Sequence, residues 1–311
     1  MRTQIVQTAY KLAGLRIVSD FPLSWLPLCC DDAAENNEVA IRRSVVPKTL
    51  RSVAAKFPNA QYNGKELLLD SPAAGRFLLR GGSEILIDPA PSSDYGEIRS
   101  FLLGTVFGAL CHQRGILPLH SSAIEVANGY VAFVGPSGAG KSTLAAVLAS
   151  RGHQVITDDV CFLRVGNQGN IWAWPGLNRI RLWEDTLTAL GLGGPEVERE
   201  LGGDNKYLIP TRPPQTPMDP RPLRRVYQLH ITQNGGGASM SRLHGATAIE
   251  ALVPNVYRLG LAEYMGYKPA AFAACVAVAI NVPVFQFSRP FGFGLLHEGI
   301  EFLEDHLRDI C

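Results

Sequence analysis

The segment 135–143, GPSGAGKST, contains the residue types and spacing with the clearest chemical meaning. It fits the pattern Gly-x-x-x-x-Gly-Lys-Ser/Thr, in which turns that glycine permits point successive backbone N–H groups at phosphate oxygens. In this pattern Lys141 neutralises the β and γ phosphates, and the hydroxyl of Ser142 can bind Mg²⁺. The residues predicted to bind the nucleotide are Gly135, Ser137, Gly138, Ala139, Gly140, Lys141, Ser142 and Thr143.

The flanking patterns agree with a phosphate-binding loop. The strand-like stretch YVAFV precedes it, and a helical pattern over 142–151, with Gly152 as a C-terminal cap, follows it. A helix that begins near Lys141 adds the positive end of its dipole to the site. The sequence therefore predicts a protein that binds ATP together with Mg²⁺.

Two adjacent carboxylates, Asp158 and Asp159, end the apolar stretch HQVIT. A phosphate-binding loop needs a second carboxylate that holds Mg²⁺ and orients the nucleophile. In a parallel α/β unit, the ends of neighbouring strands meet at one sheet edge, so we expect these carboxylates beside the loop. One side chain can then face the metal ion and the other the phosphoryl acceptor.

Several basic residues are candidates for contacts near these carboxylates. His120 follows the apolar stretch GILPL, and if its strand neighbours YVAFV it can reach an aspartate at the sheet edge. Lys206 lies in GGDNKYLIP, which is expected to be a flexible basic loop that closes on phosphates. Arg179 and Arg181 are further possible phosphate or substrate contacts.

The N-terminal part of the chain predicts a separate group of strands. Residues 1–92 contain short strand patterns between 63 and 89, with turn residues between them, which suit a small antiparallel, β-rich lobe. Residues 93–115 predict a connecting helix that Ser93 or Asp94 caps at its N-terminus.

The rest of the chain, residues 116–311, alternates strand and helix patterns and predicts an α/β catalytic domain. Within it, residues 190–222 are rich in Gly and Pro and predict a long lid or binding loop. The apolar segment 271–286 is too short for a membrane span and is expected to be a buried helix that runs into a strand. The last stretch, from GFGLLHEG onward, predicts an amphipathic helix.

The composition argues against several classes of function. The 311 residues are 46% hydrophobic and carry a formal net charge of +1, so no basic excess indicates binding to nucleic acid. No secretory signal pattern and no membrane span is visible, and the cysteines show no metal-binding or disulfide spacing. We therefore expect a cytoplasmic protein with reduced thiols, of a size that suits two lobes, and with an oligomeric state that the sequence leaves open.

Three stretches in this order, LHSSAIEV, GPSGAGKST and ITDDV, resemble the HPr kinase/phosphorylase family, whose core is similar to that of phosphoenolpyruvate carboxykinase. The resemblance covers residues 116–163 and implies an α/β fold with a P-loop kinase core of this type and a smaller β-rich N-terminal lobe. It also implies that Asp159 takes the proton from a serine hydroxyl, with His120 interacting with it. Asp158 is implied to work with Ser142 near Mg²⁺.

The stretch FLLGTVFGALCHQRGILPLHSSA, which precedes the loop, is similar to a divergent branch of HPr-kinase-like proteins. Some members of that branch accompany ribosomally made lasso peptides and phosphorylate the C-terminal serine of a precursor. The resemblance therefore implies an ATP-dependent serine kinase that acts on a peptide or small protein, with a lasso-type precursor as the favoured acceptor. The loop 190–222 and the N-terminal lobe are the surfaces expected to capture it.

Two departures from the family pattern weaken parts of this expectation. The family has a glutamate shortly before a Gly-Leu/Ile-Gly segment; aligning Gly176 of WAWPGLNRIRLW with that glycine puts Ala173 where the acid would be. Asp204 and Glu184 are the candidate substitutes. The family's C-terminal motif for phosphorolysis has no clear counterpart, which weakens the case for the reverse reaction and for HPr as acceptor.

Two other functions fit the same motifs. A small-molecule kinase acting on free serine or a related metabolite would need an enclosed pocket beside Asp159, with Arg179 or Arg181 for the substrate carboxylate. A nucleotide-dependent switch or ATPase would use the loop without a phosphoryl acceptor, and the missing glutamate favours it. The acceptor-side carboxylate favours transfer, because a protein that only binds ATP has less need of it.

Overall fold

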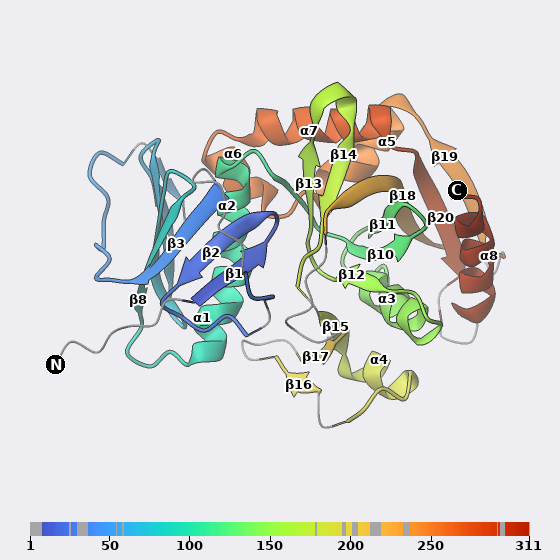
Figure 1. The fold of residues 1–311 in the computed structure, drawn as a ribbon, viewed down its shortest axis with the longest axis horizontal. Helices are drawn as coiled ribbons and strands as arrows, with labels where there is room; N and C mark the ends of the chain where they lie inside the picture. Colours follow the sequence, from blue (N-terminus) through green and yellow to red (C-terminus); the bar gives the residue numbers. More distant parts are fainter. Residues whose placement is uncertain are drawn as a thin grey trace.

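The structure is a computed structural model that describes residues 8–24, 26–29, 37–53, 55–57, 59–177, 179–194, 197–200, 205–211, 219–232, 237–290, 292 and 296–310. Within these ranges the strands form three sheets, of eight, nine and three strands, with helices packed against them (Figure 1). The chain is therefore a mixed α/β protein with several sheets, as the sequence predicted in outline.

The first sheet contains the strands of the N-terminal part. They are β1 (Thr8–Leu12), β2 (Leu15–Ser19), β3 (Glu38–Arg43), β4 (Ala55–Phe57), β5 (Ala60–Tyr62), β6 (Glu66–Ser71), β7 (Gly75–Arg80) and β8 (Glu84–Pro89). Their order is β1-β2-β3-β8-β7-β6-β5-β4. The strands predicted between 63 and 89 pair antiparallel as β6, β7 and β8, but the sheet as a whole is mixed, since β2–β3 and β3–β8 are parallel. Parallel neighbours need long connections, and the connection between β2 and β3 is long enough to bring the chain back to the same end.

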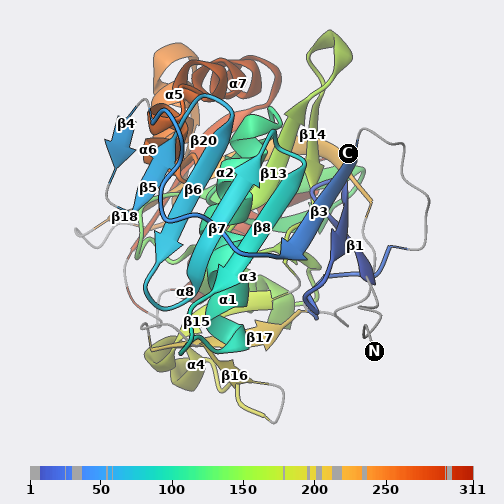
Figure 2. The same ribbon diagram turned by 90° about the vertical axis from the view of Figure 1, so that its left-hand side faces the viewer.

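A helix with a π-helical centre covers one face of this sheet. Its parts are α1 (Tyr95–Phe101), η2 (Leu102–Val106) and α2 (Phe107–Gln113). Asp94 caps it, because its side chain accepts a hydrogen bond from the backbone N–H of Glu97, whose own side chain accepts from that of Asp94. Leu102, Val106 and Phe107 are buried in one core with the strands. Figure 2 looks onto the opposite face of the sheet, with α2 behind it. The sequence predicted this helix and its cap but not the π segment.

The second sheet holds most of the remaining strands. They are β9 (Leu117–Leu119), β10 (Ser122–Val126), β11 (Gly129–Val134), β12 (Val155–Thr157), β13 (Cys161–Val165), β14 (Ile171–Trp174), β18 (Arg221–Thr232), β19 (Ser239–Leu243) and β20 (Val284–Pro290). The order β12-β10-β11-β18-β14-β13-β9 places β11 beside β18, and β20 pairs with both β18 and β19. The neighbours β11, β18 and β20 run parallel to one another.

Helices cover both faces of this sheet. On one face lie α3 (Lys141–Ser150) and α8 (Leu296–Arg308); α5 (Gly245–Leu252) and α7 (Lys268–Asn281) pack on the other. Strand β11 is buried throughout because its side chains alternate between these two cores, with Tyr130 in one and Val131 in the other.

Further short helices complete this part: η3 (Asn167–Gly169), η4 (Val253–Asn255) and α6 (Leu259–Tyr264). The predicted helix-then-strand at 271–286 is confirmed by α7 and β20. The predicted C-terminal amphipathic helix is confirmed by α8. Among the described residues, no helix is both long and apolar enough to cross a membrane.

A third, small sheet consists of β15 (Arg179–Trp183), β17 (Lys206–Pro210) and β16 (Glu198–Arg199), in that order, with α4 (Glu184–Ala189) after β15. It lies at the bottom of the molecule in Figure 1. The prediction that 190–222 is one long loop was therefore wrong in its described part, since β16, β17 and the start of β18 lie there. The rest of that segment, 195–196, 201–204 and 212–218, lies outside the described residues.

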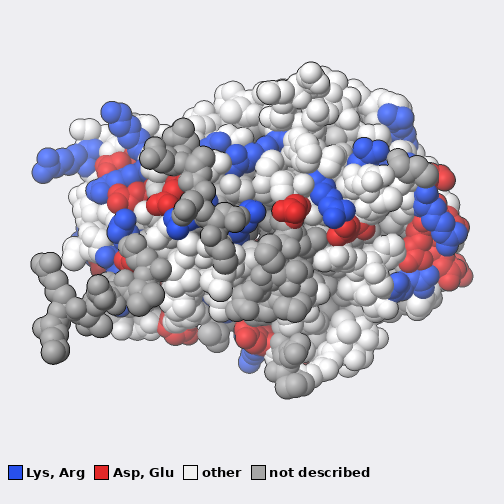
Figure 3. Space-filling model, in the orientation of Figure 1, with Lys and Arg blue, Asp and Glu red and all other residues white. Residues whose placement is uncertain are grey.

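Charged side chains of both signs share the face shown in Figure 3; they gather at its left-hand end, over the first sheet, and at its right-hand end, over α8. An ion pair joins Arg151, at the end of α3, to Glu304 of α8 at 2.6 Å, and His153 Nε2 lies 3.0 Å from the same carboxylate. These contacts hold α8 against the helix that follows the glycine-rich loop.

Candidate active site

The glycine-rich loop connects the C-terminal end of β11 to the first turn of α3. Gly135, Gly138 and Gly140 have φ angles of 150°, 82° and 85°, which side chains other than glycine rarely adopt. Gly140 is the N-cap of α3, so the positive end of this helix faces the loop. The predicted strand–loop–helix order is present here, and Gly152, with φ 95°, follows the C-cap of α3.

Lys141 lies along the loop. Its side chain is largely buried, and Nζ donates hydrogen bonds to the carbonyl oxygens of Gly135 at 2.8 Å and Pro136 at 3.2 Å. Burial lowers the pKa of Lys141 from its ordinary value, and the negative charges of Asp158 and Asp159 oppose this shift. A bound phosphate can replace the two neutral carbonyls as the partner of this ammonium group, which gives a stronger, charge-assisted bond.

Asp158 is fully buried between the loop and the third sheet. Ser122 Oγ donates to its Oδ1 at 2.5 Å, and the backbone N–H of Arg181 donates to its Oδ2 at 2.9 Å. Burial raises the pKa of the Asp158 carboxyl, and these hydrogen bonds, with a further one from the Ser142 side chain, oppose the shift. Ser122 thus holds this carboxylate by a hydrogen bond, a role that sequence reasoning missed.

Ser142 and Asp158 fit the requirements of Mg²⁺. A hydroxyl and a carboxylate already in contact supply oxygen ligands of the type that this ion takes. Among the described residues, no group of three or more His, Cys, Asp or Glu side chains could hold a metal ion. The protein therefore offers part of a coordination shell, which suits an ion that completes its shell with phosphate oxygens and water.

Asp159 occupies the turn between β12 and β13 with a φ of 92°, an uncommon backbone conformation that Asp tolerates better than most residues. Its Oδ2 lies 3.1 Å from Nη1 of Arg181, and its Oδ1 lies 3.9 Å from Nε2 of His120. The expected setting in a parallel unit was wrong in detail: β12 is antiparallel to β10, which is antiparallel to β11. β12 therefore runs in the same direction as β11. The glycine-rich loop after β11 and the aspartate turn after β12 lie at the same edge of the sheet.

His120 approaches Asp159 by a route that the sequence did not indicate. The expected neighbour of its strand was β11; instead β9 pairs with β13, and it is β10 that pairs with β11. The stretch LPLHSSAIEV is therefore two strands, not one. Burial and the charge of Lys141 lower the pKa of His120 and so favour the neutral ring, while the charge of Asp159 opposes this shift.

Asn255 links these parts, and sequence reasoning missed it. Its Oδ1 accepts a hydrogen bond from the backbone N–H of Gly135 at 3.0 Å, and its Nδ2 donates to Ala251 O at 2.8 Å. Its backbone carbonyl accepts from the N–H of His120 at 2.7 Å. One buried residue therefore fixes both the start of the loop and the position of His120.

The three predicted basic contacts come from the third sheet. Arg181 binds Glu200 Oε2 through Nε and Nη2 at 3.0 and 2.7 Å while it pairs with Asp159. Burial disfavours its charge, but Asp159 and Glu200 outweigh this and raise the pKa of Arg181. Arg179 is buried, which lowers its pKa to about 10. Lys206 begins β17 rather than lying in a flexible loop, and its Nζ lies 4.6 Å from the centre of the Trp183 ring.

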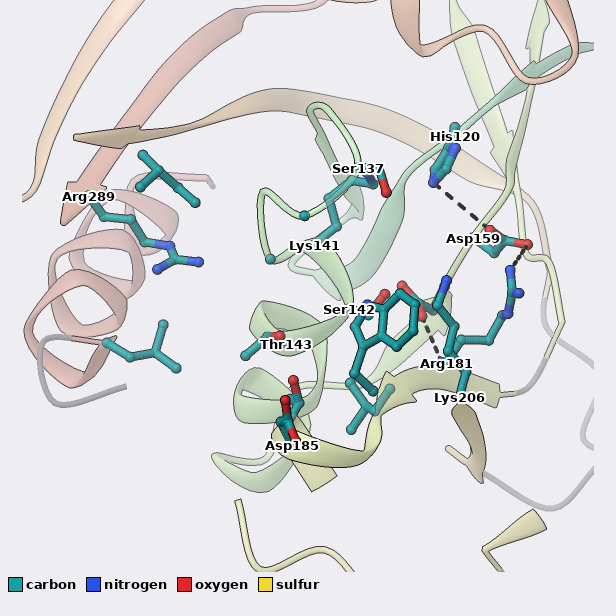
Figure 4. A pocket seen from close by; sticks show the side chains of 18 of the residues that line it. His120, Ser137, Lys141, Ser142, Thr143, Asp159, Arg181, Asp185, Lys206 and Arg289 are labelled. Atoms are coloured by element: carbon teal, nitrogen blue, oxygen red, sulfur yellow. Dashed lines mark hydrogen bonds and ion pairs between the residues drawn. The ribbon is translucent and has the colours of Figure 1, made fainter. Parts of the chain in front are cut away.

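A cavity of about 360 Å³ brings these residues together (Figure 4). It is lined by His120, Ser137, Gly138, Gly140, Lys141, Ser142, Thr143, Asp158, Asp159, Arg181, Leu182, Trp183, Asp185, Thr186, Lys206, Ile231, Arg289, Gly292 and Leu296. Most of the predicted site residues thus share one cavity. Sequence reasoning missed Trp183, Asp185, Ile231, Arg289 and Leu296, because they belong to no recognisable motif.

A second, smaller cavity of about 110 Å³ lies against the same two aspartates and Arg181. Its other walls come from β1, from the helix of the first sheet, from the chain at β13, β15 and β16, and from the segment after η4. They are Leu12, Ser100, Leu103, Gly104, Val160, Phe162, Leu177, Arg179, Glu200, Tyr257 and Arg258. Asp159 therefore stands between two cavities, one of which contains the glycine-rich loop.

Glu184, the one candidate substitute within the described residues, does not take the place of the expected glutamate. Ala173 is buried inside β14, and Glu184 is exposed and lines neither cavity; its neighbour Asp185 lines the larger one. Asp204 lies outside the described residues. Gly176 packs directly on Thr157, so a side chain there would displace the aspartate turn.

Comparisons with known proteins add little to this geometry. No protein-family model matches the chain, and no curated protein is significantly similar to it. Among solved structures, the Hpr(Ser) kinase/phosphatase from Coxiella burnetii is similar, with 13% sequence identity and a TM-score of 0.32. The similarity covers 62% of this chain and 92% of that one. A TM-score this low supports no conclusion about fold or activity.

Proposed function

We propose that this protein is an ATP-dependent kinase that transfers the γ-phosphoryl group to a serine hydroxyl of a peptide or small protein. The observation that carries the proposal is the position of Asp159 on the wall shared by two cavities. One cavity holds the glycine-rich loop and Lys141, and the other has room for an acceptor. A carboxylate between donor and acceptor is where a kinase needs its proton acceptor.

The residues divide the reaction between them. The loop N–H groups and Lys141 bind the polyphosphate, and Mg²⁺ held by Ser142 and Asp158 would neutralise charge on the β and γ phosphates. The serine oxygen forms a bond to the γ-phosphorus as the bond to the β-γ bridging oxygen breaks, and ADP leaves. Asp159 accepts the serine proton. The ion pair with Arg181, at 3.1 Å, fixes the position of the Asp159 carboxylate.

This arrangement favours transfer over a nucleotide switch or an ATPase. Arg181 is itself fixed by Glu200, so a connected chain of partly buried charges supports Asp159. A protein that only binds ATP has no use for a second cavity on the far side of this carboxylate.

Three carboxylates and three arginines line the second cavity, and since Asp159 and Glu200 both pair with Arg181, Arg258 is the arginine offered to a carboxylate near the acceptor hydroxyl. Arg179 and Arg258 line this cavity, and Arg258, which lies over the Tyr257 ring at 5.0 Å, forms no ion pair with a described residue. The cavity's volume of about 110 Å³ suits one residue rather than a folded surface. A C-terminal serine of a lasso-type precursor meets both conditions. Free serine meets them as well, which makes a small-molecule kinase the second candidate.

Intact-mass spectrometry after incubation with ATP and Mg²⁺ tests the proposal. The acceptors are a lasso-type precursor that ends in serine, its Ser→Ala variant, the same peptide with a C-terminal amide, free serine and an HPr protein. We expect a phosphate-sized mass gain on the serine-ended peptide alone, with loss of the gain in the amide. A gain on free serine and not on the peptide would select the small-molecule kinase. ATP consumption with no acceptor modified would overturn the kinase proposal in favour of a hydrolase.

A further inference from the structure

The glycine-rich loop divides the larger cavity into two ends. At one end lie His120, Asp159 and Arg181, and Arg289 lies at the other, across the loop (Figure 4). If the γ-phosphate faces Asp159, the α-phosphate and the nucleoside must extend toward the opposite end. The residues at that end are therefore placed to contact the part of the nucleotide that does not react.

Arg289 is the charged residue of that end, and its hydrogen-bonding capacity is mostly unused. It lies near the end of β20, opposite Ile231 of β18, and only 5% of its surface is exposed. Nη2 donates to Ala139 O at 3.3 Å and Nη1 to Pro290 O at 3.5 Å, both long bonds to neutral carbonyls. Its buried Nε has no partner, and it forms no ion pair with a described residue. Such a guanidinium is costly to bury unless a ligand satisfies it.

The backbone of the glycine-rich loop lies close to this guanidinium. Gly140 has no side chain, and a Cβ there would lie 2.5 Å from Nη2 of Arg289. Ile231 lies opposite Arg289 in the register of β18 and β20, and Leu296 lines the same cavity with apolar surface. A flat cation with aliphatic neighbours suits a planar, heteroaromatic ring better than it suits a phosphate group alone.

We infer that Ile231, Arg289 and Leu296 form the nucleoside compartment, and that Arg289 binds the base of the nucleotide. A guanidinium only donates hydrogen bonds, so the base must present acceptor atoms, such as ring nitrogens or a carbonyl, or its π face. The inference rests on the proposed function only in requiring a nucleotide in the loop. It adds the residue that makes binding depend on the base.

Calorimetric titration with two ligands tests this assignment. The ligands are ATP and inorganic tripolyphosphate, each with Mg²⁺, against the full-length wild-type protein and the Arg289→Met variant. Methionine keeps much of the buried stem and removes the planar donor. We expect Arg289→Met to weaken ATP binding about tenfold and to leave tripolyphosphate binding unchanged. An equal loss for both ligands would move Arg289 to the phosphates, and no loss for either would make it structural; both results overturn the inference.

A second variant protects the test against misfolding. Arg289→Lys keeps the charge and the stem but loses the plane, so we expect it also to bind ATP more weakly while it binds tripolyphosphate like the wild type. Wild-type ATP affinity in Arg289→Lys would contradict a role for the planar group. The measurement needs no acceptor, so failure to phosphorylate any peptide would count against the kinase and leave this inference standing.

Discussion

The two ends of the larger cavity differ in how their charged side chains are paired. At the acceptor end, Asp159, Arg181 and Glu200 form a connected chain of ion pairs. At the other end, Arg289 is buried and its Nε has no hydrogen-bond partner among the described residues, while the apolar Leu296 lines the same cavity. At the first end, ion pairs already fix the carboxylate that is proposed to accept the proton. At the second end, hydrogen-bond donors of Arg289 are left for a ligand. The contrast predicts that substitutions at one end change the rate of transfer and substitutions at the other change affinity.

The strongest challenge to this contrast is Asp159→Asn. Asn tolerates the same backbone conformation at φ 92°, so the fold is expected to remain, while the proton acceptor is lost. We expect about a 10³-fold fall in phosphoryl transfer, with ATP affinity close to that of the wild type. Quench assays of peptide phosphorylation measure the rate of transfer, and calorimetric titration measures the affinity for ATP. Near-normal transfer would show that another group takes the proton.

Lys141→Ala sharpens the contrast because Lys141 lies between the two ends. Loss of a charged donor to the β and γ phosphates is expected to weaken binding by about 10-fold to 100-fold and to slow transfer as well. Unlike Arg289→Met, this change should weaken ATP and tripolyphosphate equally. A loss confined to ATP would mean that Lys141 does not face the phosphates.

Asn255→Ala tests whether the loop and His120 depend on one support. The change leaves the buried N–H of Gly135 without an acceptor, so we expect a loss of about 1–3 kcal/mol in unfolding free energy, with ATP affinity and transfer falling together. Chemical denaturation measures the unfolding free energy.

Asn281→Ala is the matched control for that experiment. Asn281 makes a similar bond to the carbonyl four residues before it, at 2.8 Å, but on the exposed end of α7. An equal loss of stability in both variants would contradict a special role for Asn255.

The smallest expected effect concerns α8, which carries Leu296 of the nucleoside end. His306 Nδ1 accepts a hydrogen bond from Tyr227 Oη at 2.8 Å, and burial and Arg225 lower the pKa of His306 below its ordinary value near 6.5. The folded state therefore favours the neutral ring. Its contribution is present above pH 6.5 and is lost as the pH falls through the lowered folded-state pKa.

Denaturation at pH 7.5, 6.5 and 5.5 measures this dependence. We expect unfolding free energy to decrease toward pH 5.5, and His306→Phe, which keeps an aromatic ring beside Phe285, to flatten part of the decrease. An unchanged slope in that variant would assign the acid sensitivity to other groups, such as the buried His112.

The sequence predicted the acceptor end far better than the nucleoside end. Lys141, Asp158 and Asp159 sit in short motifs whose chemistry follows from residue type and spacing, and the structure places all three at one cavity. The partner of β9 was not predictable, because strand pairing depends on tertiary contacts across the whole sheet. Arg289 is far from the loop in sequence and meets it only because β20 packs parallel to β18.

The fold shows the same division. Helices with clear periodicity and caps, such as α8 and the helix capped by Asp94, were predicted within a few residues. Turn-forming glycine and proline residues surround β16 and β17, so the sequence pattern there predicted a loop and not strands. The register of β17 against β15, which puts Lys206 beside Trp183, is set by side-chain packing that a linear pattern does not contain.

The π segment η2 has a consequence for how such a protein diversifies. It is a short, wider stretch of the helix that packs on the first sheet. Its residues Leu103 and Gly104 line the small cavity beside Asp159. Gly104 leaves space in front of the Tyr257 hydroxyl, where a Cβ would lie 3.3 Å away. Substitutions in this one helical turn can reshape the acceptor cavity without touching the glycine-rich loop. Under the proposed function, this helical turn is a place where the acceptor preference can change while the residues that bind the nucleotide stay the same.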